Sequence, residues 1–199
     1  MDSSQYFALT SWALEPGPCL LLGCAAAVYI RGWLRIRTLY RSEHDFPRLF
    51  AYLAGLGAVF IATQSPLDSF DYLYLSAHMT QHLLLMMSAP PLILLGRPTI
   101  PLLRGLPKKF VKEGLAPFLH WELLKRACEF LTTPAMAWLL FAISTIGWHL
   151  PAAYQLALRS PFWHGLQHAS FFWTGVLFWW PIVRPVRGRS RRTARSGAG

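Results

Sequence analysis

Apolar residues gather in five windows along the chain, separated by short polar intervals. A helix that crosses the hydrocarbon core of a bilayer needs roughly 18 to 25 mostly apolar residues, and each window has about this length. We therefore predict an all-α fold, a polytopic bundle of about five transmembrane helices in a single membrane domain over residues 1–199. The predicted spans are approximately 18–36, 48–65, 72–96, 134–151 and 162–183.

Composition agrees with this pattern. Hydrophobic residues make up 54% of the chain, above the ~45–50% that is usual for soluble domains. The first eighteen residues contain no Lys or Arg, so they lack the basic region of a cleaved signal peptide. We therefore expect the first window to be retained as a span.

The basic residues predict how the bundle is oriented. The net charge is +10, and all basic residues except Arg159 lie within 31–48, 97–126 and 184–195. These intervals fall on one side of the membrane if five spans alternate, and cytoplasmic loops carry an excess of Lys and Arg. We predict an outside N-terminus and a cytoplasmic C-terminus. The basic tail 184–199 is then expected to contact anionic lipid headgroups of the bilayer rather than nucleic acid.

Histidines are the polar residues that this arrangement does not explain. The stretches "HMTQH" and "HGLQH" each place two histidines four residues apart within a predicted span, and a fifth precedes "LP" at the end of another span. An ionisable residue inside a membrane is costly and usually functional. In the alternating topology all five lie in the outer half of the membrane: His78, His82, His149, His164 and His168. His44 and His120 are expected in interfacial regions and receive no role.

Residues four apart share one face of a helix, so that each pair can present two imidazoles to one metal ion. We predict that His78, His82, His164 and His168 are direct ligands and that His149 is auxiliary. Met86 continues the face of His82 and is a further candidate, because imidazole with thioether suits copper. Asp68 is a candidate for orienting a ligand histidine through its carboxylate.

Three other interpretations stay open at this point. Paired histidines on facing helices can hold haem in a membrane electron carrier. Three histidines, a carboxylate and a metal-bound water can form an intramembrane zinc hydrolase, although no H-E-x-x-H motif occurs in the sequence. The histidines can also simply join helices by hydrogen bonds.

Several motifs occur in an order that is typical of one family. "SPLD" precedes "HMTQHLLLMMSAPPLILLGRP", followed by "WHLPAAYQLAL" and "HGLQHASFFWTGVLFWWP". Over roughly residues 45–183 the chain resembles the CtaG family of cytochrome c oxidase assembly factors. The motif residues are the five histidines and Asp68.

The resemblance implies a multi-pass protein of the bacterial inner membrane that handles copper and assists maturation of a haem–copper oxidase. Its expected partners are oxidase subunits, a homo-oligomer is compatible with the pattern, and we predict a metal chaperone rather than an enzyme, without catalytic residues. Members of the family usually continue after "FWWP" into further hydrophobic spans, whereas this sequence has an arginine-rich tail. If those helices form a wall of the site, we expect an open side here.

Overall fold

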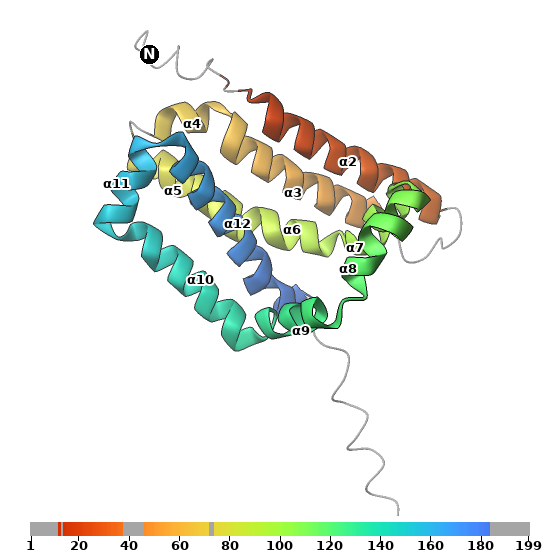
Figure 1. Cartoon of the computed structure of the whole chain (residues 1–199). Helices are drawn as coiled ribbons and strands as arrows, with labels where there is room; N and C mark the ends of the chain where they lie inside the picture. Colours follow the sequence, from red (N-terminus) through yellow and green to blue (C-terminus); the bar gives the residue numbers. More distant parts are fainter. Residues whose placement is uncertain (1–11, 13, 38–45, 72–73, 184–199) are drawn as a thin grey trace, which may run out of the picture.

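The computed structural model describes residues 12, 14–37, 46–71 and 74–183. These residues form a bundle of helices and contain no strand (Figure 1). Helix α12 runs through the bundle and packs against α6 and α10, while α3 packs on α6 and α2 packs on α7. In chain order the elements are α2 (Pro16–Arg37), α3 (Phe46–Gln64), α4 (Pro66–Asp71), α5 (Leu75–Leu83), η1 (Leu84–Ser88), α6 (Ala89–Leu95), α7 (Thr99–Gly105), η2 (Phe110–Leu115), α8 (Ala116–Leu119), α9 (Glu122–Leu131), α10 (Pro134–His149), α11 (Pro151–Arg159) and α12 (Pro161–Val183).

Long helices occupy all five predicted windows, but fewer of them have the composition of a membrane span. Within the described residues, Pro16–Arg37 and Phe46–Asp68 are long and apolar enough to cross a membrane. Two bent helix pairs qualify only if each pair is one span, which gives two to four candidates. Helix α12 has 23 residues but is not among them, because its histidines, glutamine and tryptophans reduce its mean hydropathy.

The third predicted span is continuous but irregular, since α5 passes into the π-helical turn η1 and then into α6. The carbonyl of Met86 would accept from residue 90 in an α-helix and from residue 91 in a π-helix, and both are prolines without an N–H. The indole Nε1 of Trp179 on α12 donates to this carbonyl instead, at 3.1 Å. The regular α-helix is thus interrupted at η1, just before the two prolines, but the helical segment continues through α6.

The sharp turn of this segment comes later, between α6 and α7, whose axes differ by 71°. Arg97 adopts a positive φ of 48° in this turn. The hydroxyl of Tyr29 donates to the carbonyl of Gly96 at 2.7 Å and so satisfies a carbonyl at the end of α6. The turn sends α7 back against α2.

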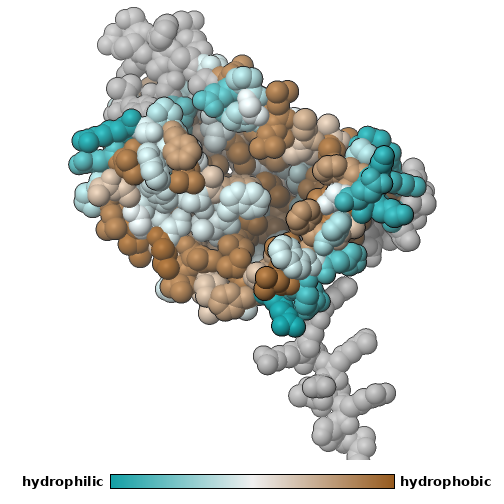
Figure 2. Space-filling view, viewed as in Figure 1, coloured by the Kyte–Doolittle hydropathy of each residue, from teal (hydrophilic) through white to brown (hydrophobic). Residues whose placement is uncertain are grey.

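Hydrophilic and hydrophobic side chains occupy different parts of the bundle surface. Helices α5 and α11 lie at one end with the start of α12 and the end of α10, whereas α7, α8 and α9 lie at the other (Figure 1). Hydrophilic surface gathers toward these two ends, and hydrophobic surface extends between them (Figure 2). Helix α9 is bent by 72° from α10, as expected for an amphipathic helix that lies along a membrane surface. The basic tail 184–199 and His44 lie outside the described residues.

Candidate metal centre

Helix α5 places the first pair of histidines inside the bundle. His78 and His82 are 2% and 1% exposed. Their ring centroids lie 4.1 Å apart, as the four-residue spacing on one helix predicts. Both imidazoles therefore sit on the face that α5 turns toward the other helices.

Helix α12 places the second pair opposite the first. His164 and His168 are each 9% exposed, and their ring centroids lie 4.2 Å apart. Across the helix interface, His78 faces His164 at 6.2 Å with nearly parallel rings. His82 faces His168 at 5.8 Å between centroids. The two pairs thus form two levels of a single four-histidine cluster.

The fifth histidine arrives from α10. His149 is the last residue of this helix, and its ring lies 6.0 Å from that of His82. Its Nδ1 lies 2.6 Å from the carbonyl oxygen of Thr145. Because a carbonyl only accepts, this contact requires the proton on Nδ1 and leaves the Nε2 lone pair available to a ligand. Unlike the other four, His149 is exposed, so it lies at the edge of the cluster.

Aromatic rings close around the imidazoles. Phe171 is fully buried and contacts His82 at 4.5 Å between centroids. The ring of Tyr154 on α11 lies 5.6 Å from that of His78 in an edge-to-face arrangement. These rings surround the buried histidines with apolar surface, where polar groups strongly favour a partner.

His82 is the clearest sign that this cluster accommodates a ligand. Neither Nδ1 nor Nε2 of its ring, buried as it is, has a hydrogen-bond partner among the described residues. Buried polar atoms are rarely left without a partner. Among the described residues, however, no three His, Cys, Asp or Glu side chains form a complete metal-binding group as they stand. The imidazoles contact one another by their ring faces and edges, and they would have to rotate to coordinate one ion.

Met86 and Asp68, the two further residues predicted for the site, each accept a hydrogen bond from another side chain. The Met86 sulfur is buried and accepts a hydrogen bond from the Thr145 hydroxyl at 3.8 Å. Asp68 accepts from the side-chain amide of Gln81 at 3.2 Å. Asp68 is therefore linked to α5 through the residue directly before His82. The metal-ligand roles of the histidines and Met86 stay predictions.

Two glutamines belong to the same region and were missed in the sequence. Gln81 and Gln167 are fully buried, and each directly precedes the second histidine of its pair. The Gln81 amide nitrogen also donates to the carbonyl of Ala62 at 2.8 Å, which ties α5 to α3. Both amide atoms of Gln167 lack a partner among the described residues. The repeated pattern His-x-x-Gln-His was the signal that could have identified them.

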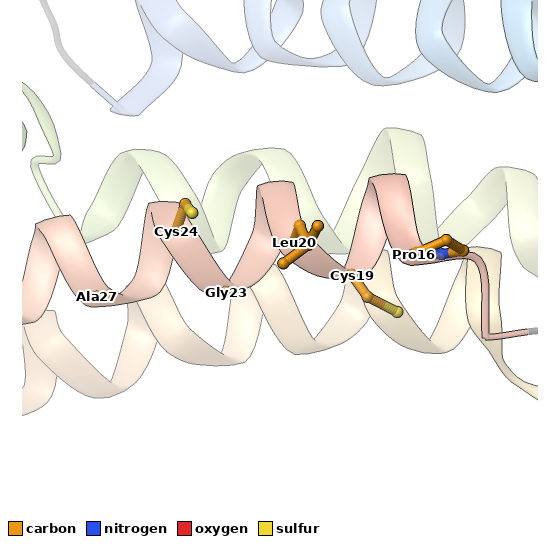
Figure 3. A pocket seen from close by; sticks show the side chains of 6 residues that line it. All are labelled: Pro16, Cys19, Leu20, Gly23, Cys24 and Ala27. Atoms are coloured by element: carbon orange, nitrogen blue, oxygen red, sulfur yellow. The ribbon is translucent and has the colours of Figure 1, made fainter.

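The cysteines of α2 lie apart from this cluster. A cavity of about 540 Å³ runs along α2 and is lined by Cys19 and Cys24 among others. The two side chains point in different directions (Figure 3). The Cys19 thiol donates to the side-chain oxygen of Gln64 at 3.4 Å. The pair therefore does not form a two-thiol site.

The fold and the cluster define a class of protein: a helical protein that has segments long and apolar enough to span a membrane and a cluster of buried histidines at one end. The family model of the cytochrome c oxidase caa3 assembly factor (Caa3_CtaG) matches residues 27–198. The chain belongs to this family, and the match is longer than the 45–183 that the motifs covered.

Curated relatives extend beyond this chain. Uncharacterized protein Mb0105 of Mycobacterium bovis is 30% identical over 182 residues, covering 88% of this chain and 27% of its own length. Uncharacterized protein ML1998 of Mycobacterium leprae is 28% identical over 173 residues, covering 82% and 26%. The chain thus spans about a quarter of the length of the curated relatives it matches. No solved structure matches the chain significantly.

Proposed function

We propose that this protein binds copper through the five-histidine cluster and supplies it during assembly of a cytochrome c oxidase. The observation that carries the proposal is His82: a buried imidazole in ring contact with three other histidines, whose two nitrogens have no partner among the described residues. Membership of the oxidase assembly family supports the choice of client. In this role the metal is cargo, and the protein acts as a chaperone rather than an enzyme.

The spacing of the rings supports coordination of one ion after small rotations. Nitrogen ligands bind such metals at ~2.0–2.1 Å, which separates the ring centroids of two imidazoles at a tetrahedral ion by about 5 Å. The centroids of neighbouring histidines here lie 4.1 to 6.2 Å apart. Rotation about side-chain bonds can bring these centroid distances to the value of about 5 Å without moving a helix. His78, His82, His164 and His168 are the proposed ligands.

The ligand types favour copper. Imidazole binds copper well, and a thioether is preferred by the cuprous ion. Met86 is buried beside Thr145, on the helical segment that follows His82. The Met86 sulfur is therefore proposed as an additional ligand for the reduced ion. Asp68 would act indirectly, by holding Gln81 and thereby the α5 helix.

The exposed fifth histidine suggests how copper leaves. Metal transfer by ligand exchange requires a ligand that a client can approach, and four of the histidines are buried. His149 is exposed, and its Nδ1 contact with Thr145 leaves Nε2 available. We assign His149 the auxiliary role of passing the ion between the buried ligands and the client.

The proposed setting is the bacterial inner membrane, crossed several times, with the histidine end outside and the C-terminus cytoplasmic. Described basic residues support this orientation, since Arg31, Arg35 and Lys108 border one cavity together, at the bundle end where α7 and α8 lie. Cytoplasmic surfaces of membrane proteins carry such an excess of positive charge. We favour a single ion over haem, because Phe171 and Tyr154 pack directly against the rings of His82 and His78.

Metal content after reductive copper loading and desalting tests the proposal. We expect the detergent-purified protein to retain copper, His82→Ala to lose it, and His120→Ala, an exposed histidine outside the cluster, to retain it. Iron with a sharp Soret band would instead indicate haem. Equal copper in the His82→Ala and His120→Ala variants would refute the proposed site.

A further inference from the structure

Helices α2 and α7 meet at the opposite end of the bundle from the histidines. The backbones of these helices touch: a Cβ on Gly32 would lie only 1.8 Å from the carbonyl oxygen of Pro101, and one on Gly105 only 1.9 Å from that of Val28. Both glycines are buried. This packing holds α2 and α7 in one fixed arrangement.

Next to this contact is a groove of about 820 Å³ between α2, α7 and the segment η2–α8. Its volume is within the ~300–1,000 Å³ range of small-molecule sites. The guanidinium of Arg35 donates to the carbonyl of Arg104 at 2.8 Å and ties the two walls together. The walls of the groove are therefore held in place by helix packing and by this hydrogen bond.

Charge in the groove has one sign. The groove is lined by five basic residues: Arg31, Arg35, Arg104, Lys108 and Lys112. No acidic residue lines it among the residues that the structure describes. All five are exposed. Such a cluster attracts an anion with more than one negatively charged oxygen.

The rest of the lining is apolar. Leu103, Leu106, Val111 and Ala116 contribute to the same groove and are partly buried. A soluble anion would leave this apolar surface without a partner, whereas a phospholipid places its phosphate beside basic residues and its acyl chains on apolar ones. Basic pockets between membrane helices on the cytoplasmic side bind anionic headgroups in this way.

We propose that this groove is a binding site for an anionic phospholipid. The headgroup phosphate contacts the basic residues, and the upper part of the acyl chains lies along Leu103 and Val111. Lipid binding at this groove does not depend on metal binding, so that a failure of one proposal leaves the other unaffected.

Native mass spectrometry of the detergent-purified protein tests the site, with dioleoyl phosphatidylglycerol and dioleoyl phosphatidylcholine as probes. A variant with Arg31→Gln, Lys108→Gln and Lys112→Gln lacks three groove charges. Each basic residue near a membrane surface strengthens binding of anionic lipid roughly fivefold, so removing three weakens phosphatidylglycerol binding about a hundredfold. Phosphatidylcholine binding should change little.

The matched control carries Lys109→Gln, Lys125→Gln and Arg126→Gln, which removes equal charge from residues that do not line the groove. We expect this control to bind phosphatidylglycerol within about threefold of the wild-type protein. An equal loss in both variants would reduce the effect to general surface charge and overturn the site. Displacement of the lipid by glycerol 3-phosphate at similar concentration would overturn the lipid assignment, because a soluble anion would then suffice.

Discussion

The hydrogen bond from Trp179 to the carbonyl of Met86 leads to the most specific prediction about this fold. Pro90 and Pro91 remove both backbone donors that this carbonyl could use, and the indole replaces them at 3.1 Å. The contact joins α12, which carries His164 and His168, to the segment that follows His82. Glycine allows the approach, since a Cβ on Gly175 would lie 2.9 Å from the same carbonyl oxygen.

The substitution Trp179→Phe keeps an aromatic ring and removes the donor. A buried carbonyl left without a partner costs about 1–3 kcal/mol, and hydrogen bonds between membrane helices contribute ~0.6 and up to ~1.7 kcal/mol. We therefore expect the free energy of unfolding to fall by about 1–2 kcal/mol. Equilibrium unfolding in mixed detergent micelles measures this quantity.

Two controls isolate the hydrogen bond. Trp173→Phe, on the same helix at a residue that is 64% exposed, should change stability by less than about 0.5 kcal/mol. Pro90→Ala restores a backbone N–H four residues after Met86, so that Trp179→Phe should cost about 1 kcal/mol less in that background. If Trp179→Phe lowers the free energy of unfolding equally with and without Pro90, or no more than Trp173→Phe does, the hydrogen bond from Trp179 to Met86 does not stabilise this fold.

Three further predictions concern the buried amides, the α2–α7 contact and the histidines. Gln81→Leu should lower the free energy of unfolding by about 1–3 kcal/mol, because it removes the hydrogen bonds to Ala62 and Asp68. Gln167→Leu should be neutral or stabilising, because neither amide atom of Gln167 has a partner among the described residues. A larger loss of stability in Gln167→Leu than in Gln81→Leu, measured by unfolding in mixed micelles, would contradict these hydrogen-bonding patterns. Gly32→Leu should abolish the folded monodisperse species in size-exclusion chromatography, while Gly17→Leu, with open space at its Cβ, should not; a normal profile for Gly32→Leu would rule out the close packing. Copper retained after desalting should fall once the pH is low enough to protonate the ligands, because imidazole binds metal only when neutral; full retention in strong acid would contradict histidine ligands.

The sequence predicted the positions of the long helices well. Predicted spans 18–36, 134–151 and 162–183 correspond to Pro16–Arg37, Pro134–His149 and Pro161–Val183. This agreement is expected, because long apolar windows produce long helices in a membrane protein. The number of spans was predicted less well: the sequence indicated about five, whereas two to four described segments have the required length and composition.

Details of tertiary packing were beyond the sequence pattern. The π-helical turn before Pro90 contains a carbonyl, that of Met86, whose hydrogen-bond donor Trp179 lies on α12, far along the chain. The contact of Gly32 with Pro101 depends on the 71° turn after α6 that brings α7 against α2. Periodicity describes one helix at a time and carries no information about such pairings.

For the candidate site too, the sequence predicted which residues lie together but not the details of their packing. Four-residue spacing and alternating topology predicted that the five histidines lie near one another, and the ring distances agree. The orientation of the rings followed from neither, because it depends on Phe171 and Tyr154 packed against them. The burial of Gln81 and Gln167 did not follow from the sequence either, because glutamine is mostly an exposed residue and its position in a motif does not show what it packs against.

X-ray absorption at the copper edge of the loaded, desalted protein tests whether the histidine cluster binds the copper ion. We expect nitrogen scatterers at ~2.0 Å with the outer-shell pattern of several imidazoles, and a loss of bound copper in His82→Ala. A spectrum dominated by sulfur ligands without imidazole scattering, or one that His82→Ala leaves unchanged, would contradict the assignment of this cluster as the copper site.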